Sequence, residues 1–176
     1  SDDGAGDNPP KGAVVTYFLA AKPESEVTLR VLDAEGNEVR SLSSILKPVY
    51  TPPEHPDWNP ESDPKPELEV EPGTRRAVWD LRYEGAGWVQ GARMDTGRPK
   101  PGPRVLPGLY TLELTVGDTT LTQPLRVEPD PRSTVSAEDR KAQLVFALGI
   151  RDQMTRIANM VDAIRGVRDQ IETRNR

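Results

Sequence analysis

The first 130 residues alternate between hydrophobic and polar side chains in short stretches, with turn-forming residues between them. Val27, Leu29 and Val31 are separated by single polar residues, and the stretch 109–116 alternates in the same way. A period of two places alternate side chains on opposite faces of an extended strand. The pattern therefore predicts strands at 13–19, 27–31, 38–42, 76–83, 109–116 and 119–127.

No helical pattern separates these predicted strands, which favours an antiparallel arrangement. Six or seven short strands joined by turns are typical of two packed sheets, whereas a parallel sheet needs helices between its strands. The 18 prolines and 14 glycines are concentrated before residue 135, as suits a loop-rich β domain. We expect an immunoglobulin-like antiparallel β-sandwich over residues 12–132, followed by a long C-terminal α-helix within 133–176.

Two long irregular stretches interrupt the predicted sandwich. Eight prolines lie between residues 47 and 73, and proline neither donates a ladder hydrogen bond nor continues a helix. We therefore predict a long surface loop at 47–73, and a second Gly/Pro-rich excursion at 84–108. Residues 1–11 are polar and rich in turn formers, so we interpret them as a linker inside a longer polypeptide.

The segment from Ser136 to Arg174 contains no proline and predicts one long helix. Ser136 suits the N-cap position, because a serine hydroxyl can accept a hydrogen bond from the first helical turn. Glu138 and Asp139 follow in that turn, where the positive end of the helix dipole favours negative charge.

Apolar residues repeat every seven positions along this predicted helix. Isoleucine occupies each d position of the heptad, and another apolar residue precedes most of them by three, at the a position. Met160 and Val167 broaden the stripe on one side, and Arg168 takes the last a position. The predicted helix interface comprises Ala147, Ile150, Met154, Ile157, Val161, Ile164 and Ile171.

Either the β domain itself or a second helix could bury this heptad stripe. A helix of roughly 55 Å overhangs a sandwich of about 120 residues, and an apolar stripe left in water promotes aggregation. We therefore expect a helical partner. The partner is either a second helix of the same polypeptide, in a helical hairpin, or the same helix of a second copy in a homodimer; the sequence leaves both open.

Composition excludes several classes of chemistry. The net charge of -5 provides no basic field for nucleic acid, and no run of 18 apolar residues predicts a membrane span. Cysteine is absent and His55 is the only histidine, so thiolate metal sites and the usual Ser-His-Asp arrangement are not expected. We predict no catalytic residue, no metal site and no cofactor.

Aromatic residues in the predicted loops offer an alternative function. Trp58 and Trp88 lie in the two irregular stretches, where exposed rings would provide a platform for a glycan or a peptide. A covering role at the ends of the sandwich is the competing interpretation. Carboxylates between 54 and 63 leave a hydrolase as a third hypothesis, but no apolar shelter marks a pair of them as acid and base.

Five short motifs along the chain resemble a known family. They lie at 8–13, 27–40, 77–83, 107–112 and 130–132, and include the Trp-Asp and Pro-Gly-Leu-Tyr elements. They are similar to the C-terminal region of bacterial sortilin-like, BNR-repeat β-propeller proteins, often labelled glycosyl-hydrolase-like. The same elements resemble the immunoglobulin-like domains of flagellar hook-capping proteins and of some secretion-sorting tails.

This resemblance implies an exported, periplasmic or extracellular protein. It also implies that a β-propeller domain of the same polypeptide lies upstream, acts as a docking partner and holds any ligand site. No catalytic residue of the family maps onto this sequence. The resemblance therefore implies a non-catalytic accessory or assembly module.

Overall fold

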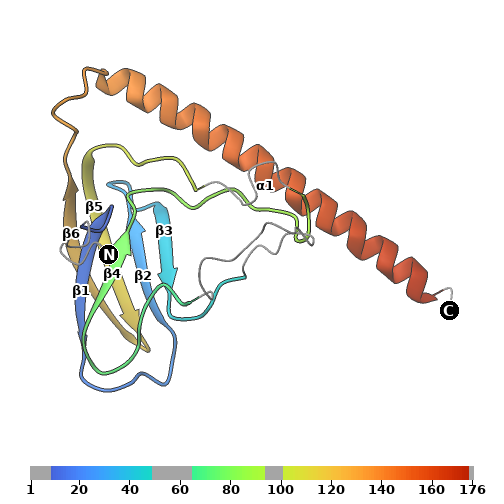
Figure 1. Cartoon of the computed structure of the whole chain (residues 1–176), viewed down its shortest axis with the longest axis horizontal. Helices are drawn as coiled ribbons and strands as arrows, with labels where there is room; N and C mark the ends of the chain where they lie inside the picture. The colour runs from blue at the N-terminus through green and yellow to red at the C-terminus, as the bar shows by residue number, and fades with distance from the viewer. Residues whose placement is uncertain (1–8, 49–64, 94–100, 175–176) are drawn as a thin grey trace, which may run out of the picture.

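The computed structural model describes residues 9–48, 65–93 and 101–174. It shows six antiparallel strands in two sheets, followed by one long helix (Figure 1). The elements are β1 (Ala13–Leu19), β2 (Val27–Leu32), β3 (Glu38–Ser43), β4 (Gly73–Trp79), β5 (Gly108–Val116), β6 (Thr119–Val127) and α1 (Ala137–Arg174).

The six strands form one sheet of two strands and one of four. The small sheet pairs β1 with β4, and the large sheet has the order β3-β2-β5-β6. Tight hairpins join β2 to β3 and β5 to β6. In the first hairpin the Asp33 carboxylate accepts hydrogen bonds from the main-chain nitrogens of Glu35 and Asn37, at 3.1 and 2.7 Å. This local bonding is why the sequence predicts a turn at this point.

The core lies between the facing sides of the two sheets. Trp79 of β4 is fully buried and meets Tyr110 of β5 edge to face, with ring centroids 5.4 Å apart. The buried residues contributed by the strands are Tyr17, Leu19, Val27, Leu29, Val31, Val39, Leu42, Ala77, Trp79, Tyr110 and Leu112. Alternate residues of β1, β2, β4 and the first part of β5 thus point inward, as the period-two pattern predicts, whereas β6 contributes no fully buried residue.

The predicted strands are confirmed, with one substantial shift of bounds. The strand expected at 76–83 is β4, which begins at Gly73 and ends at Trp79. The chain leaves the sheet because Leu81 adopts a positive φ of 59°, and the Trp79 indole nitrogen donates to the Arg82 carbonyl oxygen at 3.0 Å. A leucine in this conformation is uncommon, because its Cβ crowds the backbone.

The proline-rich loop predicted at 47–73 lies largely outside the described residues, as does the linker predicted at 1–11. Its described ends, 47–48 and 65–72, carry neither helix nor strand. Leu68 is nevertheless buried in the core, and the Tyr17 hydroxyl donates to the Glu69 carbonyl oxygen at 2.7 Å. This end of the loop is therefore attached to the two sheets, which together with their core we call the β body.

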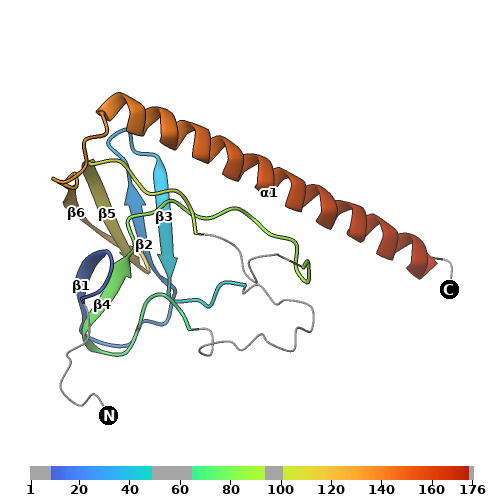
Figure 2. The same cartoon turned by 45° about the horizontal axis from the view of Figure 1, so that its top comes forward.

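The predicted helix is confirmed as α1, with 38 residues, and is about 57 Å long. Ser136 caps it: its Oγ accepts from the Asp139 main-chain nitrogen at 3.0 Å and donates to the Asp139 carboxylate at 2.9 Å. The helix starts beside the β body and its C-terminal half extends away from both sheets (Figures 1 and 2). None of the described strands packs directly against it.

Candidate protein-binding helix

An extended segment, residues 84–92, supports the helix in place of the strands, and we call it the strap. The Gly87 main-chain nitrogen donates to Thr155 Oγ1 at 3.0 Å, and Arg165 donates to the Gln90 carbonyl oxygen at 2.9 Å. Arg151 reaches the Glu84 carbonyl oxygen at 3.5 Å. These contacts span 14 residues of α1, or roughly 21 Å. The strap thus follows the helix well beyond the sheets.

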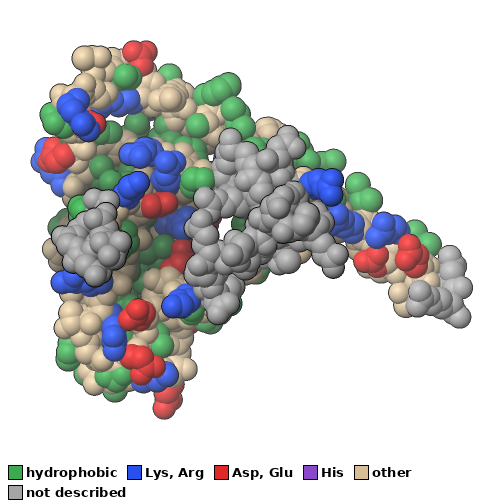
Figure 3. Space-filling model, viewed as in Figure 1, with side chains coloured by type: hydrophobic (Ala, Val, Ile, Leu, Met, Phe, Trp, Pro, Cys, Tyr) green, Lys and Arg blue, Asp and Glu red, His purple; other side chains and the backbone are tan. Residues whose placement is uncertain are grey.

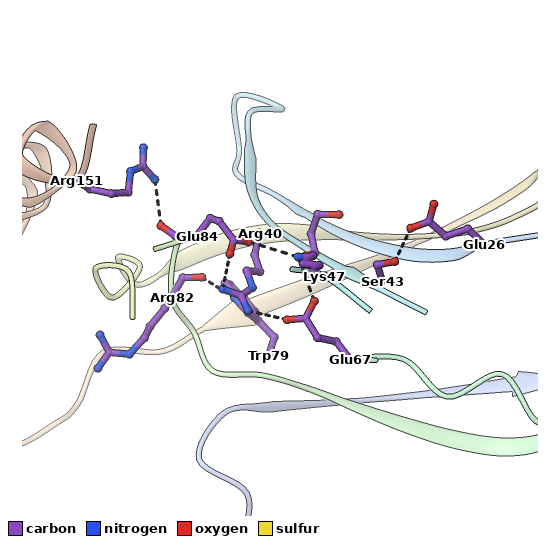
Figure 4. A network of polar contacts seen from close by, with 10 residues as sticks. Glu26, Arg40, Ser43, Lys47, Glu67, Trp79, Arg82, Glu84 and Arg151 are labelled. Atoms are coloured by element: carbon purple, nitrogen blue, oxygen red, sulfur yellow. Dashed lines mark hydrogen bonds and ion pairs between the residues drawn. The ribbon is translucent and has the colours of Figure 1, made fainter. Parts of the chain in front are cut away.

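Ion pairs fasten the first residue of the strap to β3 (Figure 4). The Arg40 guanidinium pairs with Glu84 at 3.3 Å and with Glu67 at 2.7 Å. Lys47 lies 3.1 Å from Glu67 and 3.7 Å from Glu84. The Glu84 main-chain nitrogen also donates to the Val39 carbonyl oxygen at 3.2 Å. Glu84 therefore contacts the sheet through its side chain and nitrogen, and the helix through its carbonyl oxygen.

The Arg40 network is a cluster of shared charges and not a set of isolated surface pairs. The Arg40 side chain is 19% exposed, so its pairs are partly shielded from water. Arg40 Nε is buried without a hydrogen-bond partner. Glu67 Oε2 also lacks a hydrogen bond of good geometry, although the Lys47 ammonium lies beside it as an ion pair. Burying the Arg40 guanidinium without these carboxylates would cost free energy. The network therefore holds Glu84, the first residue of the strap and hence its root, against β3.

The segment before the strap packs closely against residues 102–105, which precede β5. The Tyr83 nitrogen donates to the Pro103 carbonyl oxygen, and the Val105 nitrogen donates to the Leu81 carbonyl oxygen, each at 2.9 Å. A Cβ added to Gly102 would lie 2.1 Å from the Tyr83 carbonyl oxygen. Only glycine therefore allows the two backbones this close approach.

One face of α1 rests on the strap and on the neighbouring loops. Leu144 and Ala158 are buried on this face. Its half-buried members are Arg140, Ala147, Leu148, Arg151, Thr155 and Val161. Beside its N-terminal half lies an open cleft of about 630 Å³. Leu81, Val105 and Val127 line the side of the cleft that belongs to the β body.

A second face of the helix is apolar and open to solvent, and we call it the exposed seam. It comprises Phe146, Ile150, Ile157, Met160, Ile164, Val167 and Ile171, which are between 48% and 72% exposed. Their spacing of three, four and seven residues places them along one stripe of the helix. Hydrophobic side chains follow the outer edge of the helix beyond the β body in Figure 3. Only Gln153 interrupts the stripe.

The exposed seam differs from the interface predicted from the sequence in its second line of residues. The four isoleucines and Met154 are exposed, as an interface with an outside partner requires. Ala147 and Val161 are half-buried, and Ala147 lines the cleft beside the β body. Phe146, Met160 and Val167, which each lie four residues ahead of an isoleucine, are exposed as well. Phe146 is the member of this line that the sequence pattern did not identify.

Only one of the two candidate ligand aromatics lies within the described residues. Trp88 is half-buried in the strap, and its indole nitrogen donates to Gln90 Oε1 at 3.3 Å. Trp58 and His55 lie outside the described residues. Within 9–48, 65–93 and 101–174, no group of three His, Cys, Asp or Glu could hold a metal ion. No helix in those ranges is long and apolar enough to cross a membrane.

Comparison with known proteins adds no assignment to this geometry. No protein family, curated protein or solved structure matches the chain. The resemblance carried by the five short motifs therefore stays a prediction.

Proposed function

We propose that this chain is a non-catalytic accessory or assembly module that presents a long helix to another helix. The exposed seam is the observation that supports this proposal. Seven large apolar side chains stay in water along one stripe of α1, and burying each against a partner contributes on the order of 1 kcal/mol. The width and period of the stripe fit a helix better than a sheet or a flat surface.

The strap gives the proposed binding helix a fixed direction. A helix held at Arg151, Thr155 and Arg165 loses little orientational freedom when a partner binds. The network around Arg40 fastens the same strap to β3. In this proposal the β body and the strap hold the helix in one orientation, and the exposed seam is the surface that contacts the partner.

An immunoglobulin-like relationship for the β body is part of the proposal. In this proposal β3, β2, β5 and β6, which are neighbours in that order, are the strands C′, C, F and G of that fold, and the paired β1 and β4 are B and E. Tyr110 lies near the start of β5, and its hydroxyl donates to the Leu106 carbonyl oxygen at 2.7 Å. This is the geometry of the tyrosine corner of immunoglobulin-like domains. Both features support the assignment.

The setting of the module is proposed from the sequence resemblance alone. It places a β-propeller domain upstream in the same polypeptide and an exported location for the whole protein. The β body would then dock beside the propeller, while the helix associates through the exposed seam. Neither part of this setting is needed for the seam to act as a binding surface.

Site-specific photocrosslinking in the cells that make the protein tests the proposed function. A benzophenone amino acid replaces Ile157 on the exposed seam or, as a matched control, Asn159, which is exposed on another face. We expect a covalent adduct from position 157 and none from position 159. Absence of an adduct at 157, and also at a second seam position, 164, would overturn the proposal.

A further inference from the structure

We infer that the partner of the exposed seam is the same helix of a second copy, packed antiparallel. This inference deepens the proposed function and depends on it. It commits to one of the two partners that the heptad pattern leaves open, because the seam is complementary to itself and one antiparallel register overlaps it along its full length.

That register matches the two helices from end to end. Phe146 of one copy lies opposite Ile171 of the other, and Ile150 lies opposite Val167. Each step of three or four residues along one helix then meets an equal step in the reverse direction along its partner. Ile157 therefore meets Met160 at the centre. Opposite residues of the two helices form four kinds of pair, and each kind occurs twice because the two copies are related by symmetry. The pairs are Phe146–Ile171, Ile150–Val167, Gln153–Ile164 and Ile157–Met160.

The charges at the two ends of the stripe favour the antiparallel direction. Asp139 lies seven residues before Phe146, and Arg174 lies seven residues after Val167. Both therefore continue the row of the stripe that contains Phe146, Met160 and Val167. A parallel pair would place Asp139 opposite Asp139 and Arg174 opposite Arg174. The antiparallel register separates Asp139 from the opposite Arg174 by about 6 Å along the axis. With the spacing of about 8–10 Å between packed helices added, the two opposite charges lie roughly one screening length apart and attract weakly, whereas the parallel pair would bring like charges together.

The area and the surroundings of the seam suit this pairing. Each seam side chain exposes on the order of 100 Å² of apolar surface, so two copies together offer roughly 1,400 Å², within the usual range of stable interfaces. The strap contacts another face: Ala158 is buried while its neighbour Ile157 is exposed, and adjacent residues point about 100° apart. Each β body lies beside the N-terminal half of its own helix. The two bodies therefore lie at opposite ends of an antiparallel pair.

Disulfide trapping between two variants of the whole chain tests the inference. The sequence has no cysteine, so every disulfide reports introduced residues. Ile150→Cys and Val167→Cys chains of different tagged size are oxidised separately and together. We expect a mixed disulfide between the two variants and little crosslinking of either alone. In the antiparallel register, the same position in two copies is about 26 Å apart, far beyond the reach of a disulfide.

Two other outcomes would overturn the inference. Efficient crosslinking of each variant with itself would indicate a parallel pair. The absence of any crosslink, together with a monomeric mass of the unmodified chain by light scattering, would exclude a second copy as the partner. Phe146→Cys with Ile171→Cys provides a second pair, should either of the first variants fold poorly. An adduct with a different protein from position 157 in cells would then retain the proposed function without this inference.

Discussion

Removing one hydroxyl tests how the helix is held on the strap. Thr155 Oγ1 accepts a hydrogen bond from the Gly87 nitrogen at 3.0 Å and donates to the Arg151 carbonyl oxygen at 3.0 Å. Thr155→Val keeps the shape of the side chain and removes both bonds. A net hydrogen bond contributes about 0.5–1.5 kcal/mol, so the Gly87 amide should open about two- to tenfold more often. Amide hydrogen exchange at Gly87 measures this directly.

Thr173→Val is the matched control for this experiment. Thr173 also donates to the carbonyl oxygen four residues earlier, that of Asp169, at 2.8 Å, but it lies beyond the contacts between strap and helix. We expect Thr173→Val to change only the local exchange near the C-terminus of α1. The reasoning is refuted if Gly87 exchanges at the same rate in the Thr155→Val and Thr173→Val proteins, since the strap would then be held by other contacts.

Three further predictions concern association, packing and pH. Ile157→Asp should weaken association through the exposed seam at least about 100-fold, because it replaces apolar burial with a desolvated carboxylate; sedimentation measures it, and Asn159→Asp should have no effect. Gly102→Ala should lower the free energy of unfolding in urea by about 1–3 kcal/mol, because its Cβ meets main-chain oxygens at the root of the strap. The opposite result is expected for Gly149→Ala, which meets nothing within 4 Å and raises helix propensity. Burial raises the pKa of Tyr110 to about 12, so the folded protein holds this proton more tightly than the unfolded chain. Its contribution to stability is complete below pH 10 and is lost between pH 10 and 12, by up to about 1.4 kcal/mol per pH unit, and a titration of unfolding above pH 10 that shows no such loss would contradict the burial argument.

Short-range patterns predicted the elements of this fold well. Alternation, the β-branched and aromatic run at 13–19 and the turn at 117–118 together predicted five strands to within a residue or two. Ser136 and the proline-free segment predicted the start and length of α1. The bounds of β4 were shifted because Leu81 ends it through a backbone conformation that no sequence signal marks. The core position of Leu68 depends likewise on tertiary packing.

The support of the helix could not be predicted from the sequence. The strap is a Gly-rich stretch with no periodic pattern, and its role arises from contacts with residues more than 60 positions away, at Thr155 and Arg165. Those contacts determine which side of the heptad stripe faces solvent. Val161 is half-buried in the folded chain, whereas Phe146 is exposed. The heptad predicted that a seam exists, whereas its orientation depends on contacts between segments far apart in the sequence.

The reactivity of one seam position in the assembled protein tests the central claim most directly. Ile164→Cys lies on the exposed seam, and Asp162→Cys lies nearby on another face; both native side chains are exposed in the single chain. If a partner helix covers the seam, a maleimide should label the thiol at 164 at least about tenfold more slowly than the thiol at 162 in cells that make the protein. Equal labelling rates at the two positions would contradict the claim that another helix covers this seam.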